Sequence, residues 1–137
     1  MVAIFCNRII AGEPINVNAK RVTGDPGCIR DYVYIDDVAG ANVAALEGKI
    51  PDSILNVGTG QETSTLQLTE ILQKKLGNTV TVNSTEKRAG DIERSLLDAD
   101  RLVELLGPVV SIDEGLAQTA KWFRERAESG TDAKNPS

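Results

Sequence analysis

Two arginines and one aspartate are the residues whose types and positions could do chemistry. Arg30 opens an extended segment, whereas Arg88 and Asp91 lie in the longest polar loop. Planar guanidinium groups suit phosphate oxygens, and two of them suit a pyrophosphate. An ionised aspartate only accepts hydrogen bonds, which suits the hydroxyls of a ribose. The alternative is that Arg30 is a surface or salt-bridge residue and that residues 87–91 form a solvated turn.

A glycine-rich turn, Gly58-Thr59-Gly60, is the second candidate. It lies between a predicted strand and a predicted helix, which is the context of a dinucleotide-binding fingerprint. However, Thr63 replaces the third glycine, and the next predicted strand ends at Asn83 without an acidic residue for a ribose hydroxyl. We therefore favour a tight turn in which glycine permits a positive φ angle. A phosphate contact from the N-terminus of the following helix is the alternative.

Residues for catalysis or for metal binding do not assemble from this sequence. Histidine is absent, which removes His-based triads and imidazole ligands. Neither Tyr32 nor Tyr34 has a lysine four residues later, so no Tyr-x-x-x-Lys dyad is present. The pair Asp36-Asp37 is predicted to start a helix, with paired catalytic carboxylates as the alternative. We expect no catalytic residue and no metal site.

Length and charge restrict the class of protein further. The chain has 137 residues, which is enough for about one domain. Its net charge is −5, which argues against a protein that binds nucleic acid or a membrane surface. Cys6 and Cys28 fit no metal spacing and indicate reduced thiols. No apolar run is long enough to cross a bilayer, and the first residues do not resemble a signal peptide. We expect a cytoplasmic location.

The elements that must position these residues form a small α/β domain without a complete Rossmann fold. Residues 1–128 are predicted to form this domain, and residues 129–137 a disordered polar tail. Apolar periodicity and capping residues predict about five helices and few short strands. The helices are expected at 2–12, 36–47, 64–76, 98–107 and 111–128, and the strands at 15–18, 29–35, 53–57 and 79–82.

Four segments in one order make the sequence resemble a known family. They are Gly27-Cys28-Ile29-Arg30-Asp31-Tyr32-Val33-Tyr34-Ile35-Asp36-Asp37-Val38; Asn56-Val57-Gly58-Thr59-Gly60; Arg88-Ala89-Gly90-Asp91; and Gly115-Leu116 with Thr119 and Trp122-Phe123. Together they resemble the C-terminal, substrate-binding part of the NAD-dependent epimerase/dehydratase family, the extended short-chain dehydrogenases. Within this family the UDP-glucose 4-epimerases look most similar. The resemblance extends to about residue 126.

The resemblance implies a role for each of the charged residues described above. It implies that Arg30 and Arg88 hold the pyrophosphate of a nucleotide-diphosphate sugar and that Asp91 holds the ribose. It also implies that the strand before the long loop lines the base, through Ile15, Asn16 and Val17. The glycine-rich turn would then belong to the substrate-binding part and not to the NAD site.

The family's NAD-binding half, with its glycine-rich loop and its catalytic Tyr-x-x-x-Lys, has no counterpart in these 137 residues. We therefore expect no cofactor on this chain alone, since NAD in the family belongs to the absent half. The expected function is to bind a UDP-sugar-like ligand within carbohydrate metabolism, without catalysis by this chain alone. The alternative is a non-catalytic interaction module that forms a homodimer through the surface that would face the NAD-binding domain. That surface is expected on the first helix and on Val38, Ala41 and Ala45.

Overall fold

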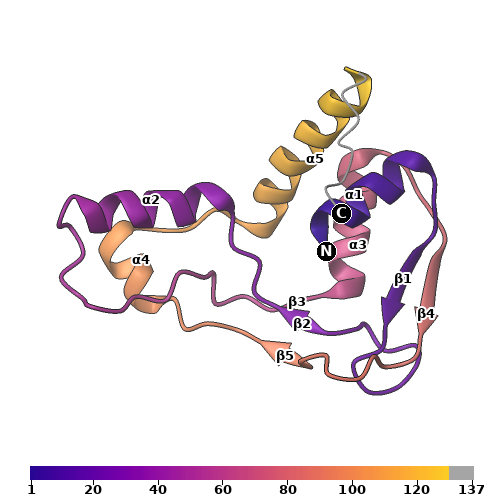
Figure 1. The fold of residues 1–137 in the computed structure, drawn as a ribbon, viewed down its shortest axis with the longest axis horizontal. Coiled ribbons are helices and arrows are strands. Elements are labelled where there is room, and N and C mark those ends of the chain that lie inside the picture. Colours follow the sequence, from indigo (N-terminus) through magenta and orange to yellow (C-terminus); the bar gives the residue numbers. More distant parts are fainter. Residues whose placement is uncertain (130–137) are drawn as a thin grey trace.

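The structure is a computed structural model that describes residues 1–129. Residues 130–137, to which most of the predicted polar tail belongs, lie outside the described residues. The described part is α/β, as predicted, with helices alternating with very short strands (Figure 1). In chain order the elements are α1 (Val2–Ala11), β1 (Ile15–Asn18), β2 (Ile29–Arg30), α2 (Ile35–Leu46), β3 (Thr63–Ser64), α3 (Thr65–Leu76), β4 (Val82–Thr85), β5 (Arg94–Ser95), α4 (Asp100–Leu106) and α5 (Ile112–Glu128).

The main lobe contains the hydrophobic core. Helices α1, α3 and α5 pack together, and β1 pairs in parallel with β4 beside them (Figure 1). Every apolar side chain that leaves water here stabilises the fold, at about 25 cal/mol per Å² of buried surface. The buried residues of this core are Phe5, Cys6, Ile9, Ile15, Val17, Leu68, Leu72, Leu76, Leu116 and Ala120.

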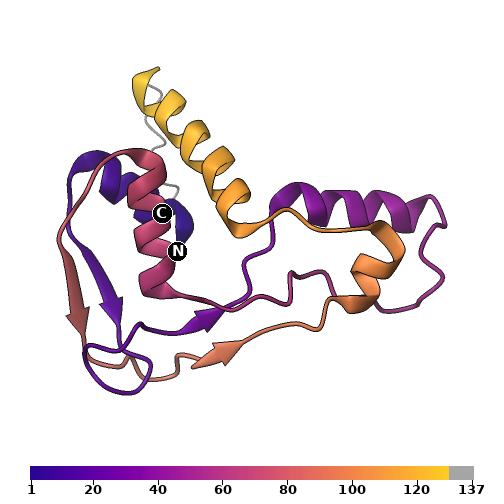
Figure 2. The ribbon, with the colours of Figure 1, turned by 180° about the vertical axis from the view of Figure 1, so that it is seen from behind.

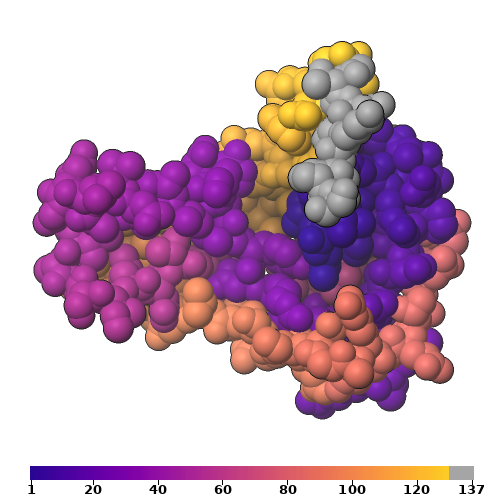
Figure 3. All heavy atoms as spheres, viewed as in Figure 1, coloured from indigo at the N-terminus to yellow at the C-terminus, as the bar shows by residue number. Residues whose placement is uncertain are grey.

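A smaller lobe projects from the first and is built on α2 and α4. The two views from opposite sides place these helices together, away from α1, α3 and α5 (Figures 1 and 2). In the space-filling view the lobe forms a separate bulge (Figure 3). Its buried apolar side chains include Ala41 and Ala44 on α2 and the larger Leu102 on α4. Asp37 ties α2 to the segment before α5, because its Oδ2 accepts a hydrogen bond from the amide of Val110 at 3.0 Å.

A three-stranded sheet in the order β3-β2-β5 lies between the lobes (Figure 1). β2 pairs antiparallel with β3 and parallel with β5, so that Arg30 faces Thr63 on one side and Ser95 on the other. Each strand has only two residues, so side-chain contacts at both ends must support the pairing.

Local capping signals fix the helix ends. Ser64 Oγ accepts from the amide of Gln67 at 3.2 Å, and Gln67 Oε1 accepts from the amide of Ser64 at 2.9 Å, which completes a capping box at α3. Ser111 caps α5 as predicted, accepting from the amide of Glu114 at 3.3 Å. Gly77 ends α3 with a φ of 71°, a left-handed conformation that glycine adopts without strain.

The strand predictions were partly wrong. The predicted strand 29–35 is reduced to Ile29–Arg30, and α2 begins at Ile35, so Asp36 lies in the first helical turn and does not cap it. Residues 53–57 form no strand, since they have no neighbouring strand and Ile54 is 86% exposed. The predicted strand 79–82 is displaced to Val82–Thr85, because the amide of Val80 donates to Gln73 Oε1 of α3 at 2.8 Å.

Helical periodicity in the sequence also predicts apolar, core-facing positions, and some of these predictions were wrong. The predicted positions include Ile4, Phe5 and Ile9 on the first helix, Val38, Ala41, Ala45 and Leu46 on the second, and Ala127 on the last. Ile4 is 59% exposed and Leu46 is 89% exposed. Ala45 and Ala127 are not buried either. On α1 the buried positions are instead Phe5, Cys6 and Ile9, of which Phe5 and Ile9 were predicted outright. Helical periodicity found the buried leucines of α3 but made the apolar faces of α1, α2 and α5 too wide.

Candidate functional site

β2, which carries Arg30, pairs with β5, which directly follows the polar loop that carries Arg88 and Asp91. Arg30 is opposite Ser95 in a parallel register, and Asp91 precedes Ser95 by four residues. At about 3.4 Å per extended residue and about 4.8 Å between strands, the Cα atoms of Arg30 and Asp91 lie no more than about 20 Å apart. The β2–β5 pairing therefore limits how far Arg30 can lie from the loop that precedes β5.

Arg88 and Asp91 belong to one tight turn. The amide of Asp91 donates to the carbonyl of Arg88 at 3.3 Å, and Gly90 has a φ of 85°. Arg88 is exposed and Asp91 is half-buried. We refer to these four residues as the 88–91 turn. It carries two opposite charges, the Arg88 guanidinium and the Asp91 carboxylate, which are three residues apart in the sequence.

Glu93 anchors this turn at its base. Its Oε1 binds Nζ of Lys87 at 2.7 Å, and its Oε2 binds Nε of Arg21 at 2.8 Å. These hydrogen bonds, from Lys87 first and then Arg21, lower the pKa of Glu93 to about 2. The carboxylate is therefore ionised throughout the ordinary pH range.

Arg30 is half-buried on β2, and its Nη1 donates to the carbonyl of Ile29 at 2.8 Å. Among the described residues, neither Arg30 nor Arg88 forms an ion pair with a carboxylate. By contrast, Arg94 on the neighbouring strand pairs with Glu62. The two predicted pyrophosphate-binding arginines thus keep guanidinium donors available for an anion. No contact within residues 1–129 joins their side chains directly.

The predicted base-lining residues fall into two groups. The side chains of Ile15 and Val17 are 0% and 2% exposed and belong to the core. Only Asn16 turns its side chain outward, where its Oδ1 accepts from Nδ2 of Asn83 on β4 at 3.1 Å. A base on this strand would therefore meet the main chain of Ile15 and Val17 and the amide of Asn16.

Asp31 is the central residue of this region, and the sequence alone did not reveal it. Its carboxylate accepts hydrogen bonds from the Thr59 amide at 3.0 Å, the Thr59 hydroxyl at 2.6 Å, the Gly60 amide at 3.2 Å and the Leu97 amide at 3.4 Å. A Cβ atom at Gly58 would lie 2.6 Å from Asp31 Oδ2, so this position requires glycine because of the close approach. An acidic residue after a strand, combined with a later Gly-x-Gly turn, is the sequence signal that could have revealed the contact.

This contact distinguishes between the interpretations of the glycine-rich turn. Its amide groups, which would hold a phosphate in a dinucleotide site, already bind an internal carboxylate. The residues therefore do not fit NAD here, and the turn has a structural role, as favoured from the sequence. Within residues 1–129 no cluster of ligating side chains could hold a metal ion. No helix of this part is long and apolar enough to cross a membrane.

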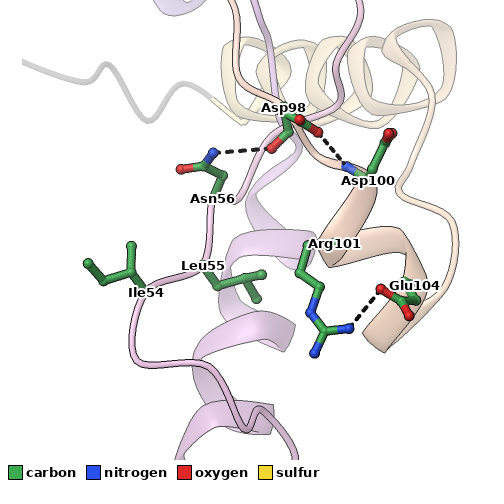
Figure 4. A pocket seen from close by; sticks show the side chains of 7 residues that line it. All are labelled: Ile54, Leu55, Asn56, Asp98, Asp100, Arg101 and Glu104. Carbon is green, nitrogen blue, oxygen red and sulfur yellow. Dashed lines mark hydrogen bonds and ion pairs between the residues drawn. The ribbon is translucent and has the colours of Figure 1, made fainter.

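Two cavities flank the region. The cavity in Figure 4, about 600 Å³, is lined by Ile54, Leu55, Asn56, Asp98, Asp100, Arg101 and Glu104. Arg101 is neutralised there by Asp52 and Glu104, so the excess of carboxylates opposes a phosphate ligand. A smaller cavity of about 220 Å³ lies between α1, residues 32–35 and the start of α5, directly after Arg30 and Asp31 in the chain. Because of its carboxylates, the cavity of about 600 Å³ is not the predicted diphosphate site.

The fold and these side chains define a small α/β domain that presents two guanidinium groups and a carboxylate on adjoining segments, without a dinucleotide-binding site among the residues described. No family model matches the chain. It is 37% identical over 130 residues to the UDP-glucose 4-epimerase of Mycolicibacterium smegmatis, covering 93% of this chain and 40% of the relative. It is 32% identical to a putative UDP-glucose 4-epimerase of Methanocaldococcus jannaschii, covering 90% of this chain and 39% of the relative.

Solved structures agree. The UDP-glucose 4-epimerase of Thermus thermophilus, in complex with NAD, matches with a TM-score of 0.81 at 37% identity, over 90% of this chain and 39% of that one. The enzyme of Thermotoga maritima with UDP-glucose matches with a TM-score of 0.75 at 37% identity, over 92% of this chain and 40% of that one. The chain thus corresponds to the C-terminal part of the NAD-dependent epimerase/dehydratase family, as the motifs predicted. It spans about 40% of the length of the relatives it matches.

Proposed function

We propose that the chain is the nucleotide-sugar-binding portion of a sugar epimerase or dehydratase and binds a UDP-sugar-like ligand. Arg30 and Arg88 would bind the diphosphate, and Asp91 would accept hydrogen bonds from the ribose hydroxyls. The observation that carries the proposal is the parallel pairing of β2 with β5, in which Arg30 lies opposite Ser95, four residues after Asp91. Similarity to the Thermotoga maritima enzyme, solved with UDP-glucose, supports the class of ligand.

Under this proposal the reaction itself needs residues beyond those described. In the intact family NAD would supply hydride transfer. It would bind to a domain other than the one described, whose residues include no site for it. The chain's own contribution is to bind and orient: two guanidinium groups fix the diphosphate, and Asp91 fixes the nucleoside end. Alone, these residues would bind the ligand without converting it.

A calorimetric titration tests the proposal. UDP and UDP-glucose are titrated into the chain and into the variants Arg30→Gln and Arg88→Gln, each of which loses charged hydrogen bonds to phosphate. We expect each variant to weaken UDP binding by about tenfold or more. Arg101→Gln is the matched control, because it removes an arginine on α4, in the other lobe, and should leave the affinity unchanged. The absence of heat at millimolar UDP, with a folded chain, would refute the proposal.

The alternative of self-association rests on exposed apolar side chains. Met1 and Ile4 at the first helix are 52% and 59% exposed, which favours a covering partner. The second predicted contact face is less suitable, because Ala41 is buried and Val38 is half-buried within the small lobe. Light scattering at rising protein concentration tests this alternative, and a monomer throughout would oppose it.

A further inference from the structure

A carboxylate outside the proposed ligand contacts holds the 88–91 turn in place. Glu93 follows the turn by two residues, and its two oxygens bind different cations. Oε1 binds Nζ of Lys87, which directly precedes the turn, at 2.7 Å. Oε2 binds Nε of Arg21, which belongs to the loop 20–27, at 2.8 Å. One side chain therefore closes the turn at its base and joins it to a second loop.

The loop 20–27 is itself held by internal hydrogen bonds. The carboxylate of Asp25 accepts from the amides of Lys20 at 2.8 Å and Arg21 at 2.7 Å, and also from those of Val22 and Gly27. These bonds keep the pKa of Asp25 well below its usual range. The main chain of Arg21 is thus fixed at the point from which its side chain reaches Glu93.

The main chain of Glu93 adds a third connection. Its carbonyl accepts from the amide of Ile29 at 3.0 Å, immediately before Arg30 on β2. Glu93 therefore contacts both parts of the proposed site: its side chain binds Lys87 beside the 88–91 turn and Arg21 in loop 20–27, and its main chain binds Ile29 next to Arg30. In Figure 1 the loop between β4 and β5 accordingly runs beside the loop that follows β1.

We infer that Glu93 is a positioning residue for the nucleotide site, which fixes Arg88 and Asp91 relative to Arg30 without touching the ligand. This inference rests on the proposed function and adds a residue that sets its affinity. Because both ion pairs of Glu93 are exposed, each contributes modestly, and their joint loss should weaken binding by about threefold to tenfold.

A double-mutant cycle tests the inference, with UDP as the titrated ligand. Glu93→Gln should weaken UDP binding by about threefold to tenfold in the unaltered background. In the Arg88→Gln background the loss should be clearly smaller, because Asp91 is then the one ligand group of the turn that Glu93 still positions. A merely structural role would instead lower the thermal midpoint and add equally in both backgrounds. Arg21→Gln removes one of the two ion pairs and should weaken UDP binding in the same direction but by less, which keeps the inference testable if Glu93→Gln fails to fold.

Glu104→Gln is the matched control, because it removes an exposed carboxylate that binds Arg101 at 2.7 Å in the other lobe. Its UDP affinity should equal that of the unaltered chain. If Arg88→Gln weakens binding while Glu93→Gln and Arg21→Gln do not, the inference is wrong and the proposed function stands. Equal effects of Glu93→Gln with and without Arg88 also overturn it. Absence of UDP binding by the unaltered chain overturns the proposed function and this inference together.

Discussion

Removal of the Asp31 carboxylate should destabilise the junction between β2 and the glycine-rich turn. Four donors point at this half-buried group: the Thr59 amide and hydroxyl and the amides of Gly60 and Leu97. Hydrogen bonds to a charged acceptor contribute about 1.5–3 kcal/mol each when buried, and less here because water can reach donors on an exposed turn. Asp31→Ala should therefore lower the free energy of unfolding by about 2–4 kcal/mol in urea denaturation followed by circular dichroism.

A second substitution tests the same contact from the other side. A Cβ atom at Gly58 would lie 2.6 Å from Asp31 Oδ2 and 3.0 Å from the Cβ of Leu97. Gly58→Ala should cost about 1–3 kcal/mol through overpacking. In the Asp31→Ala background this cost should fall by about 1 kcal/mol, since the nearest atom is gone. Gly40→Ala on α2 is the control, because its Cβ would meet nothing within 4 Å.

The control should stabilise the helix by up to about 1 kcal/mol, independently of Asp31. An Asp31→Ala variant that unfolds at the same urea concentration as the unaltered chain would refute the proposed role of the carboxylate. The proposed role would also be refuted if the free-energy costs of Asp31→Ala and Gly58→Ala were simply additive. Additive costs would mean that the two positions are not in contact in solution.

Three further predictions concern the main lobe. Ser64→Ala removes half of the α3 capping box and should cost about 1 kcal/mol in thermal unfolding; no change would show that the cap is not formed. Leu72→Ala empties a fully buried position and should cost about 2–5 kcal/mol in urea denaturation, whereas a cost below about 1 kcal/mol would contradict its burial. Burial raises the pKa of the Cys6 thiol to about 11, so alkylation at about pH 8 should require unfolding. Because the thiol ionises more readily in the unfolded chain, this group should also lower stability as the pH rises from about 9 to 11.

The helices could be predicted from sequence because their signals are local. The Ser64 cap, the Gly77 stop and the periodic leucines of α3 all lie within one segment, and the structure agrees with them. β1 was predicted with its observed bounds, Ile15–Asn18, but the two-residue strands could not be predicted, because such a strand exists only through its partners. β2 depends on β3 and β5, which lie far along the chain, and residues 53–57 have strand-like composition but no partner.

The candidate site was likewise predictable where its signals are local and not where they depend on distant segments. The chemistry of Arg30, Arg88 and Asp91 can be read from residue type, and their motifs point to one family. The supporting residues are different in kind. Glu93 and Asp31 act through contacts with Arg21, 72 residues away, and Thr59, 28 residues away. The Gly-x-Gly turn gives a sequence signal for the partner of Asp31, but nothing in the spacing around Glu93 indicates Arg21.

The position of Arg30 therefore depends on two distant segments at once, the one around β5 and the start of α3. The main-chain hydrogen bonds around β2 run from the Ile29 amide to the Glu93 carbonyl at 3.0 Å, from the Asp31 amide to the Ser95 carbonyl at 3.1 Å, and from the Thr65 amide to the Cys28 carbonyl at 3.1 Å. With only two residues of its own, β2 cannot hold its register without these neighbours. A change that loosens any one of them should move Arg30 relative to the 88–91 turn, and the affinity for a diphosphate should respond before the core of the main lobe does.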